Sequence, residues 1–327
     1  MLEFFKLGHY RVTLTPESTI CMPAFNKGGI LRGAFGTSLK RLVCSMDKRT
    51  GCGLCILKDK CAYTLIFNPT GINPAKRLQN VPRGYVLKPP LEREKEYTPD
   101  RPLSFEMILI GDRINYLPYV IVSLIELGKA GIGLNRGRFI LGDIRVTSTY
   151  PPLEKSSDSI YDPVSNTVKN ILNPITGSEL LEYARKINRH KVTLQFLTPA
   201  RIKFNPTAEK GKSNVVRVPE FHHIIRRLRD RINALSITYC GGPIDVDFKG
   251  IAERAAEVKT REANIRWIEI KRKSRTQPVQ HDQSGFIGEI TFEGDLEEFL
   301  PLIILGEYVH VGEDAVFGNG WYRIQYS

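Results

Sequence analysis

Two short apolar segments at distant points of the chain share one pattern and predict an internal repeat. Residues 124–128 read LIELG, and residues 302–306 read LIILG. Each segment runs into a glycine-rich stretch that is followed by a strand-like segment. Internal similarity constrains the fold strongly, because each copy must form the same structural unit. We therefore expect two units of one architecture in tandem.

The spacing of apolar residues predicts the order of helices and strands around this repeat. The strand-like segments cover residues 2–14, 101–111, 139–146, 190–202, 263–275, 285–294 and 321–326, and the helical segments cover residues 29–43, 117–128, 220–235 and 296–306. A polar, proline-rich stretch lies around residues 69–102. Strand, helix, strand, strand, helix, strand is the order of a ferredoxin-like fold, and the chain indicates it twice over.

These segments define the predicted domain organisation. We predict an α+β protein of two ferredoxin-like domains, at residues 1–149 and 190–327, with a cysteine-rich insertion at residues 44–61 of the first. The second contains a glycine-rich loop at residues 306–320. A polar linker region, residues 150–189, separates the two domains and includes a short helical pattern near its end.

The charge of the chain indicates a polyanionic partner. Among 327 residues, 47 are lysine or arginine and 35 are aspartate or glutamate, so the formal net charge is +12. A positive field attracts polyanions, which release counterions when the protein binds. No apolar run approaches the roughly 20 residues of a spanning helix, and the N-terminus lacks an apolar signal core. We expect a cytoplasmic protein that binds nucleic acid and not a membrane.

Four of the six cysteines are clustered. Cys44, Cys52, Cys55 and Cys61 are separated by seven, two and five residues. In a reducing compartment such clustering favours metal binding over disulfides. Four thiolates suit tetrahedral zinc, which we predict as a structural ion. An iron–sulfur cluster would use the same ligands, and buried thiols without a metal are the remaining alternative.

Three stretches of the sequence resemble a known family. They read GGILRGAFGTSLKRLVC with the following cysteines and CAYTLIF, then GLNRGRF, and finally EYVHVGEDAVFGNGWYRI near the C-terminus. Their glycine and basic residues are similar to those of the CRISPR-associated RAMP endoribonucleases, which cleave precursor CRISPR RNA within its repeats. This resemblance implies two RAMP-like ferredoxin domains, a repeat-RNA substrate, and cleavage through the RNA 2′-hydroxyl, without a catalytic metal, to a 2′,3′-cyclic phosphate.

Two alternatives to cleavage remain open at this point. One is a non-catalytic RAMP subunit that holds CRISPR RNA in an effector complex with other subunits. The other is a zinc-containing nucleic-acid-binding module unrelated to CRISPR, although the paired repeat segments and the C-terminal glycine loop argue against it. Either a monomer or a homodimer is compatible with the sequence.

Metal-free cleavage needs a base, an acid and cations around the phosphate. Relatives of the resembled family often carry a histidine on the first helix, but residues 28–43 contain none. We predict His310, which lies in the strand-like segment YVHVG, together with Lys40 and Tyr10 as catalytic residues. His9 is an alternative histidine. Catalysis by Lys27, Tyr10 and Lys40 without histidine stays open, as does binding without cleavage.

Basic residues and glycines supply the predicted RNA contacts. Arginines crowd one side of the helix at residues 220–235, and a hairpin with a cationic base follows it; solvated surfaces are the alternative for both. Glycines near the C-terminus could direct backbone N–H groups at phosphate, or could form a plain turn. The predicted contacts are Lys27, Arg32, Arg41, Arg226, Arg229, Lys271, Lys273, Gly312, Gly318 and Gly320.

Overall fold

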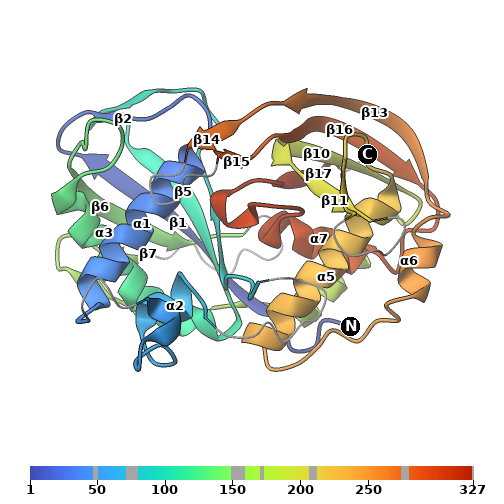
Figure 1. Ribbon diagram of the computed structural model, residues 1–327, viewed down its shortest axis with the longest axis horizontal. Helices are drawn as coiled ribbons and strands as arrows, with labels where there is room; N and C mark the ends of the chain where they lie inside the picture. Colours follow the sequence, from blue (N-terminus) through green and yellow to red (C-terminus); the bar gives the residue numbers. More distant parts are fainter. Residues whose placement is uncertain are drawn as a thin grey trace. The chain divides into compact units, whose positions relative to one another are not determined.

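The computed structural model describes residues 1–46, 51–70, 80–148, 159–169, 173–205, 212–273 and 280–325 (Figure 1). The chain forms two compact units. The N-terminal unit contains Phe4–Thr176 and Ala234–Gly242, and the C-terminal unit contains Met1–Glu3, Gly177–Asn233 and Pro243–Ser327.

The N-terminal unit contains one ferredoxin-like sheet with two helices. Its main elements are β1 (Lys6–Pro16), α1 (Lys27–Val43), β3 (Tyr85–Lys88), β5 (Leu103–Ile110), α3 (Leu117–Ala130) and β6 (Phe139–Val146). The strands pair in the antiparallel order β3-β5-β1-β6. Because β1 lies between the third and fourth strands of the βαββαβ unit, this order is the ferredoxin-like one.

Short elements extend this unit. They are β2 (Ile20–Cys21), the 3₁₀ helix η1 (Cys52–Leu54), α2 (Ala62–Ile66), β4 (Glu96–Tyr97), the 3₁₀ helix η2 (Gly111–Tyr116), β7 (Ser159–Asp162), β8 (Thr167–Val168) and β9 (Ile175–Thr176). Strand β7 pairs with β6, β8 pairs with β7, and β9 pairs with β1. Part of the predicted linker region therefore extends the first sheet.

The alternation of side chains along β1 separates the two faces of this sheet. Leu14 lines an apolar core with Leu31 and Phe35 of α1. Tyr10 lies on the same face as Leu14, since four residues separate them. His9 therefore points to the opposite face.

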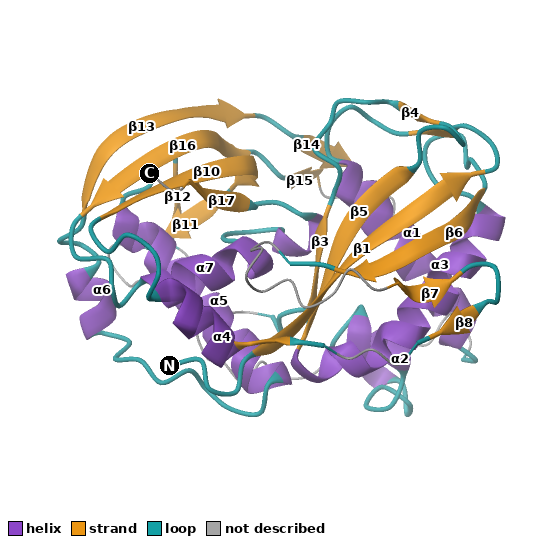
Figure 2. Ribbon diagram, turned by 180° about the vertical axis from the view of Figure 1, so that it is seen from behind, coloured by secondary structure: helices purple, strands orange, loops and turns teal. Residues whose placement is uncertain are grey.

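The C-terminal unit repeats this plan (Figure 2). Its main elements are β10 (Lys191–Ala200), α5 (Phe221–Tyr239, whose last residues belong to the N-terminal unit), β13 (Lys259–Ile268), β16 (Gly285–Glu293), α7 (Leu300–Val309) and β17 (Tyr322–Gln325). The antiparallel order β13-β16-β10-β17 matches that of the first sheet. The prediction of tandem ferredoxin-like domains is confirmed.

The remaining elements of this unit lie around the sheet. They are α4 (Gly177–Ala184), the hairpin β11 (Ile202–Phe204) and β12 (Asn214–Val216), α6 (Gly250–Arg254), the pair β14 (Lys271–Lys273) and β15 (Gln280–Asp282), and the 3₁₀ helix η4 (Ala315–Phe317). Figure 2 shows α5 and α7 on one side of the sheet.

The glycine that ends each of the two repeated apolar segments, Gly128 or Gly306, is required for the same reason in both units. A Cβ atom on Gly128 of α3 would collide with the backbone oxygen of Phe139, the first residue of β6. A Cβ atom on Gly306 of α7 would collide with the hydroxyl of Tyr322, the first residue of β17. In each unit the second helix therefore packs against the closing strand through a glycine.

Two predictions about local structure were wrong. Strand β3 lies inside the stretch that was predicted to be polar and proline-rich. Helix α7 continues to Val309 and ends at His310, where a strand was predicted. In the part of the chain that the structure describes, the helices are all too short or too polar to cross a membrane.

Candidate nucleic-acid interface

Helix α1 places two cations over aromatic rings of the N-terminal unit. The Arg32 guanidinium carbon lies 4.5 Å from the ring centre of Phe67, and the Lys40 ammonium lies 5.6 Å from that of Tyr63. Because eight residues span about two helical turns, both cations lie on one face of α1. A Cβ on Gly36, midway between them, would collide with the Phe67 ring, so glycine allows the ring to approach the helix.

Arg83 adds a third cation to this face. Its Nε donates a 3.0 Å hydrogen bond to the Phe67 carbonyl. Burial, and next the positive charge of Arg32, lowers the pKa of Arg83, so the two positive charges repel each other. We call Arg32, Lys40 and Arg83 the α1 cation patch. A phosphate between the two guanidinium groups would relieve their repulsion.

Buried aromatic side chains form the floor of the α1 cation patch. Tyr85 is fully buried, and burial raises its pKa to about 12 against the opposing charges of Arg32 and Arg83. The Tyr85 ring stacks on that of Phe67 with centroids 6.1 Å apart. A rigid apolar floor holds cations in place and limits their contact with water, which strengthens their attraction for an anion.

The other predicted RNA contacts on α1 differ from one another. Arg41 is exposed and available to a ligand. Lys27 is only 2% exposed; it donates to the Glu92 carbonyl and lies 5.7 Å from the Tyr97 ring centre. Burial lowers the pKa of Lys27, while the charge of Glu92 opposes this shift. The predicted RNA contact at Lys27 was therefore wrong, since the ammonium is enclosed by the protein.

The arginines of α5 were predicted to track an RNA backbone, and most of them bind their own unit instead. Arg229, 2% exposed, pairs with Asp230 at 2.7 Å and donates to the Phe248 carbonyl. Arg227 Nε donates to the Lys203 carbonyl and Arg231 Nε to the Val309 carbonyl, each at 2.7 Å. The prediction for Arg229 was wrong because its donors are used internally.

Arg226 is half-buried beside the hairpin β11–β12. Its guanidinium carbon lies 5.8 Å from the ring centre of Phe204. Lys271 is exposed at the start of β14, where an RNA could reach it. Lys273 lies in β14, paired with Gln280, and its side chain lies outside the described part of the chain.

The C-terminal glycines shape the loop that follows α7. Gly312, Gly318 and Gly320 have φ values of 92°, 89° and 68°, which favour glycine. The N–H groups of Glu313 and Gly320 donate to the carbonyls of Arg201 and Pro199, both at 2.9 Å.

Close packing is a second reason for glycine at these positions, in addition to the backbone conformation. A Cβ on Gly312 would lie 2.5 Å from the Arg201 oxygen, and one on Gly320 would collide with the Val311 oxygen. The Gly318 carbonyl accepts a 2.7 Å hydrogen bond from Thr198. The three glycines therefore hold the loop against the end of β10, and the phosphate contact at Gly312, Gly318 and Gly320 stays a prediction.

Two of the three predicted catalytic residues lie in the interior. His310 is 0% exposed, has a φ of 62° and stacks parallel to Trp321 with centroids 6.0 Å apart. Tyr10 is 2% exposed in the core of the N-terminal unit, where burial raises its pKa. Neither side chain is presented to a substrate in this structure, so both predictions need correction. Lys40 is half-buried in the α1 cation patch and retains access to a ligand.

His9, the alternative histidine, belongs to a charged cluster on the opposite face of the sheet from α1. Its Nε2 lies 2.8 Å from Oε2 of Glu106, and Arg11 contacts the other carboxylate oxygen at 3.0 Å. Since a carboxylate only accepts, His9 Nε2 is the donor. Burial lowers the pKa of His9 despite this hydrogen bond. His9 and Lys40 therefore do not form the predicted catalytic pair.

The four clustered cysteines are free thiols. Cys44 is exposed, whereas Cys52, Cys55 and Cys61 are half-buried around η1 and the start of α2. Burial raises the pKa of Tyr63, and nearby Cys52 and Cys44 contribute to the shift, so both cysteines lie near this ring. Among the described residues, no three of the cysteine sulfurs lie within 4.8 Å of one another. Zinc at these cysteines stays a prediction.

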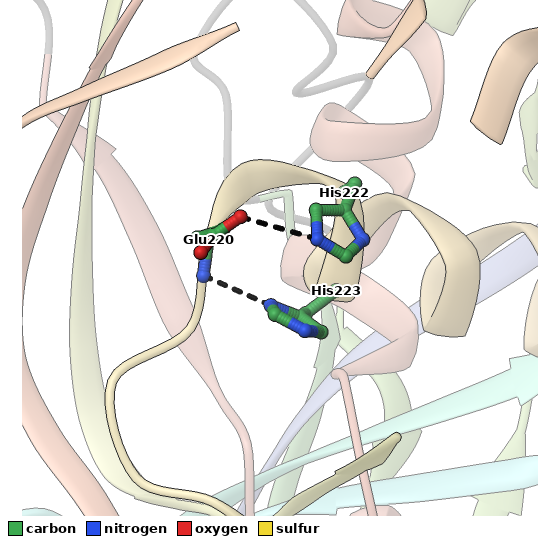
Figure 3. Close-up of side chains that lie close together, drawn as sticks. All are labelled: Glu220, His222 and His223. Carbon is green, nitrogen blue, oxygen red and sulfur yellow. Dashed lines mark hydrogen bonds and ion pairs between the residues drawn. The ribbon is translucent and has the colours of Figure 1, made fainter. Parts of the chain in front are cut away.

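The structure brings together a histidine cluster that our sequence interpretation missed (Figure 3). Glu220, His222 and His223 lie at the start of α5 with ligand atoms all within 4.8 Å of one another. His222 Nε2 lies 3.2 Å from Glu220 Oε2, and the Glu220 N–H donates to His223 Nδ1 at 3.1 Å. Adjacent histidines following a glutamate were the available sequence signal.

Burial controls the charge of this cluster. It lowers the pKa of His222 below its ordinary value, against the effect of Glu220. Burial, and next the neighbouring His222, lowers the pKa of His223 to about 4. Both imidazoles are therefore neutral near pH 7.

Comparison with known proteins gives two family matches. The model described as AF_1859_N, N-terminal domain, matches residues 5–172, slightly more than half of the chain. The model described as CRISPR-associated endoribonuclease Cas6 matches residues 194–322. The first match covers the sheet of the N-terminal unit, and the second covers the sheet of the C-terminal unit.

Three individual proteins are similar over almost the whole chain. An uncharacterized protein of Archaeoglobus fulgidus is 25% identical over 305 residues, 91% of each chain. A solved Cas6 product complex is 18% identical with a TM-score of 0.58 and covers 98% of this chain and 100% of its own. Thermus thermophilus Cas6 is 16% identical with a TM-score of 0.55, covering 98% and 99%. The structural likeness supports the tandem fold.

The tandem ferredoxin-like units and the two family matches define the class, which is that of the CRISPR-associated RAMP-like proteins. The first model covers more than half of the chain, so the chain belongs to the family described as AF_1859_N, N-terminal domain, while its residues 194–322 match the CRISPR-associated endoribonuclease Cas6 model. The Cas6 match supports an endoribonuclease that processes CRISPR repeat RNA.

Proposed function

We propose that this protein binds CRISPR repeat RNA and cleaves one phosphodiester without a catalytic metal. The adjacent 2′-hydroxyl attacks the phosphorus, the bond to the 5′-oxygen breaks, and the products carry a 2′,3′-cyclic phosphate and a 5′-hydroxyl. The α1 cation patch is the observation that carries this proposal, together with the Cas6 match.

Three cations over an aromatic floor suit the charge of the reaction. The positive charge of Arg32 acts on Arg83, and planar guanidinium groups bind phosphate oxygens in pairs. Donors already fixed in place stabilise the negative charge that develops on the phosphorane, because they need little reorganisation. We assign Lys40 to the leaving 5′-oxygen, which its ammonium can protonate or neutralise.

Cleavage of the host's own repeat RNA in EDTA tests this proposal. The substrate is compared with a twin that carries a 2′-deoxy nucleotide at the cleavage position mapped on the unmodified repeat. We expect cleavage of the unmodified RNA alone, with a cyclic phosphate on the 5′ fragment. Cleavage of the twin, or a strict requirement for a divalent ion, would show that the mechanism is wrong.

A Lys40→Ala variant tests the assignment of the acid. We expect the single-turnover rate to fall by about 100-fold, in the range of general acid–base catalysis, with RNA affinity changed much less. Lys129→Ala is the matched control, because Lys129 is an exposed lysine of α3 paired with Glu126. Equal rates for the two variants would exclude Lys40 from the reaction.

Burial of His310 and Tyr10 favours a second candidate function. In that case the protein is a RAMP subunit that holds CRISPR RNA, with other effector subunits, and does not cut. Tight binding of the repeat with no cleavage of either RNA would support this candidate. Gel filtration with and without RNA would separate a monomer from a homodimer.

We also propose that Cys44, Cys52, Cys55 and Cys61 bind a structural zinc ion. Four thiolates form a suitable donor set, and the described turns place Cys52 and Cys55 at the two ends of η1. Elemental analysis should give one zinc per chain more for the purified protein than for a Cys52→Ser/Cys55→Ser variant. Iron together with a visible charge-transfer spectrum would indicate an iron–sulfur cluster instead.

A further inference from the structure

We propose that Glu220, His222 and His223 form a binding site for a divalent transition-metal ion in the C-terminal unit (Figure 3). The ion would be of the zinc, nickel, cobalt or copper class. This inference goes beyond RNA processing and does not depend on it. It also concerns a site separate in sequence from the four cysteines.

The distances fit a single ion without a change of backbone. The Nε2 atom of His222 and Oε2 of Glu220 are 3.2 Å apart. Two ligand atoms at roughly 2.1 Å from a tetrahedral ion are separated by about 3.4 Å. The third ligand, from His223, lies within 4.8 Å of the other two. A single ion can therefore contact all three side chains once His223 gives up the hydrogen bond that its Nδ1 accepts from the Glu220 N–H.

The local backbone explains why adjacent histidines converge here. Consecutive residues of a regular helix point about 100° apart, but His222 and His223 belong to the first turn of α5. The Glu220 N–H donates to His223 Nδ1 and draws this ring back towards the helix start. As a result the two rings are tilted by 37° with centroids only 3.9 Å apart.

One nitrogen of the cluster has no hydrogen-bond partner among the described residues. The Nδ1 atom of His222 is buried and makes no hydrogen bond there, whereas its Nε2 meets Glu220. A buried polar atom without a partner costs free energy and calls for an explanation. Since a carboxylate only accepts, Nε2 carries the proton and donates to Glu220, and the buried Nδ1 keeps an unpartnered lone pair. A metal ion at Nε2 would take the place of this proton, and the neutral ring would then carry its proton on Nδ1.

The donor set selects the class of ion. Two imidazoles and one carboxylate are typical ligands of zinc and of other late first-row transition metals, whereas magnesium and calcium prefer oxygen ligands. Phe204 packs its ring edge-on against both imidazoles, with centroids 5.4 Å and 4.7 Å away, and covers one side. The Glu220 side chain is 69% exposed, so water can complete the coordination.

Arg226 opposes the binding of a cation at this site. Its guanidinium carbon lies 5.8 Å from the ring centre of Phe204, which packs against both imidazoles, so its positive charge acts from nearby. The Glu220 carboxylate offsets this charge and is the single acid among the three ligands. We therefore expect moderate affinity, and we expect an Arg226→Gln variant to bind the ion more tightly than the natural protein.

Titration of the full-length, untagged protein with Co²⁺ tests the site. Co²⁺ bound by imidazole and carboxylate absorbs weakly in the visible region, whereas Co²⁺ bound by thiolates adds intense sulfur-to-metal charge-transfer bands. We expect both signals if the cysteines also bind metal. The weaker signal should disappear in His222→Asn, and the apparent Kd should rise at least about tenfold in Glu220→Gln.

His190→Asn is the matched control, because His190 is an exposed histidine of the same unit. This variant should retain the full visible signal. Glu220 is mostly exposed, so Glu220→Gln should fold normally even if the histidine variants do not, which thermal unfolding without metal will check. Unchanged Co²⁺ affinity in Glu220→Gln, or a spectrum of thiolate type alone, would overturn the proposal.

Discussion

The first helices of the two ferredoxin-like units occupy the same position in the fold but use their cations differently. On α1, Arg32 and Lys40 lie over aromatic rings, and the positive charge of Arg32 acts on Arg83. On α5, Arg227 and Arg231 donate to backbone carbonyls of their own unit. The number of arginines in a sequence segment therefore does not predict how much positive charge a ligand can reach.

The second helices of the two units, α3 and α7, also differ in how much of their surface is buried. All ten residues of α7 are buried. Helix α3 keeps Tyr119 and Val122 at 45% and 42% exposure. The C-terminal unit thus uses both of its helices mainly for its own packing, whereas the N-terminal unit keeps part of its helical surface accessible.

The largest contrast between the units should appear when α7 loses a core side chain. Leu302 is 0% exposed, so Leu302→Ala should lower the free energy of unfolding by about 3 kcal/mol through lost burial and a cavity. Val122→Ala, on exposed α3 surface, should cost less than about 0.5 kcal/mol. Urea unfolding followed by circular dichroism measures both. Similar losses of stability in the two variants would mean that α3 and α7 contribute equally to packing.

The arginines of α5 should prove structural. Arg229→Ala removes a buried ion pair and leaves Asp230 and the Phe248 carbonyl without this donor, so it should cost about 3 kcal/mol. Arg266→Ala, an exposed arginine of β13, is the control and should change stability by less than about 0.5 kcal/mol. If Arg229→Ala kept its stability but lost RNA affinity, our interpretation of α5 would be wrong.

The charged cluster of the N-terminal sheet should give stability a dependence on acid pH. Burial alone would raise the pKa of Glu106, but the His9 hydrogen bond and the charge of Lys88 hold it well below its ordinary value. Stability from this shift is present above about pH 4.3, the unfolded value, and is lost as pH falls towards the folded pKa. Glu106→Gln should therefore cost about 2 kcal/mol at pH 7.

Urea unfolding between pH 7 and pH 3 tests this expectation. The difference between the natural protein and Glu106→Gln should shrink as the pH falls, because only the natural protein loses a favourable carboxylate. A difference independent of pH would mean that Glu106 contributes through packing and not through its charge.

The smallest expected effect concerns α1 itself. Arg32→Ala should weaken repeat-RNA binding about tenfold, roughly 1.4 kcal/mol, and reduce the salt dependence of binding by about one phosphate contact. Arg138→Ala is the control, since Arg138 is exposed and paired with Glu17. Fluorescence anisotropy at several salt concentrations measures both variants. Equal RNA affinities of the two variants would show that the α1 cation patch does not contact the RNA.

The sequence predicted the fold well because the fold depends on periodic patterns. Apolar spacing placed α1, α3, α5 and most strands, and the repeated glycines of α3 and α7 correspond to one packing contact in each unit. Strand β3 was missed because four residues within a proline-rich stretch carry too little periodicity.

The site was predicted less well because charge and residue type do not reveal burial. His310 looked like a strand residue, but the helix reaches Val309 and the chain turns at His310 with a positive φ. Lys27 and Arg229 looked like surface cations, yet carbonyl groups distant in sequence bind them. Such long-range partners leave no local pattern, so these residues could not be identified without the structure.

The boundary between the two units falls inside α5, and this has a consequence for synthesis on the ribosome. Residues 234–242 complete the N-terminal unit, where the Tyr239 hydroxyl donates a 2.5 Å hydrogen bond to the Pro82 carbonyl. The nascent chain cannot finish this unit after its last strand, β9, has emerged. The 66 further residues up to Gly242 must first leave the exit tunnel, so the N-terminal unit stays incomplete until the C-terminal part of α5 has been synthesised.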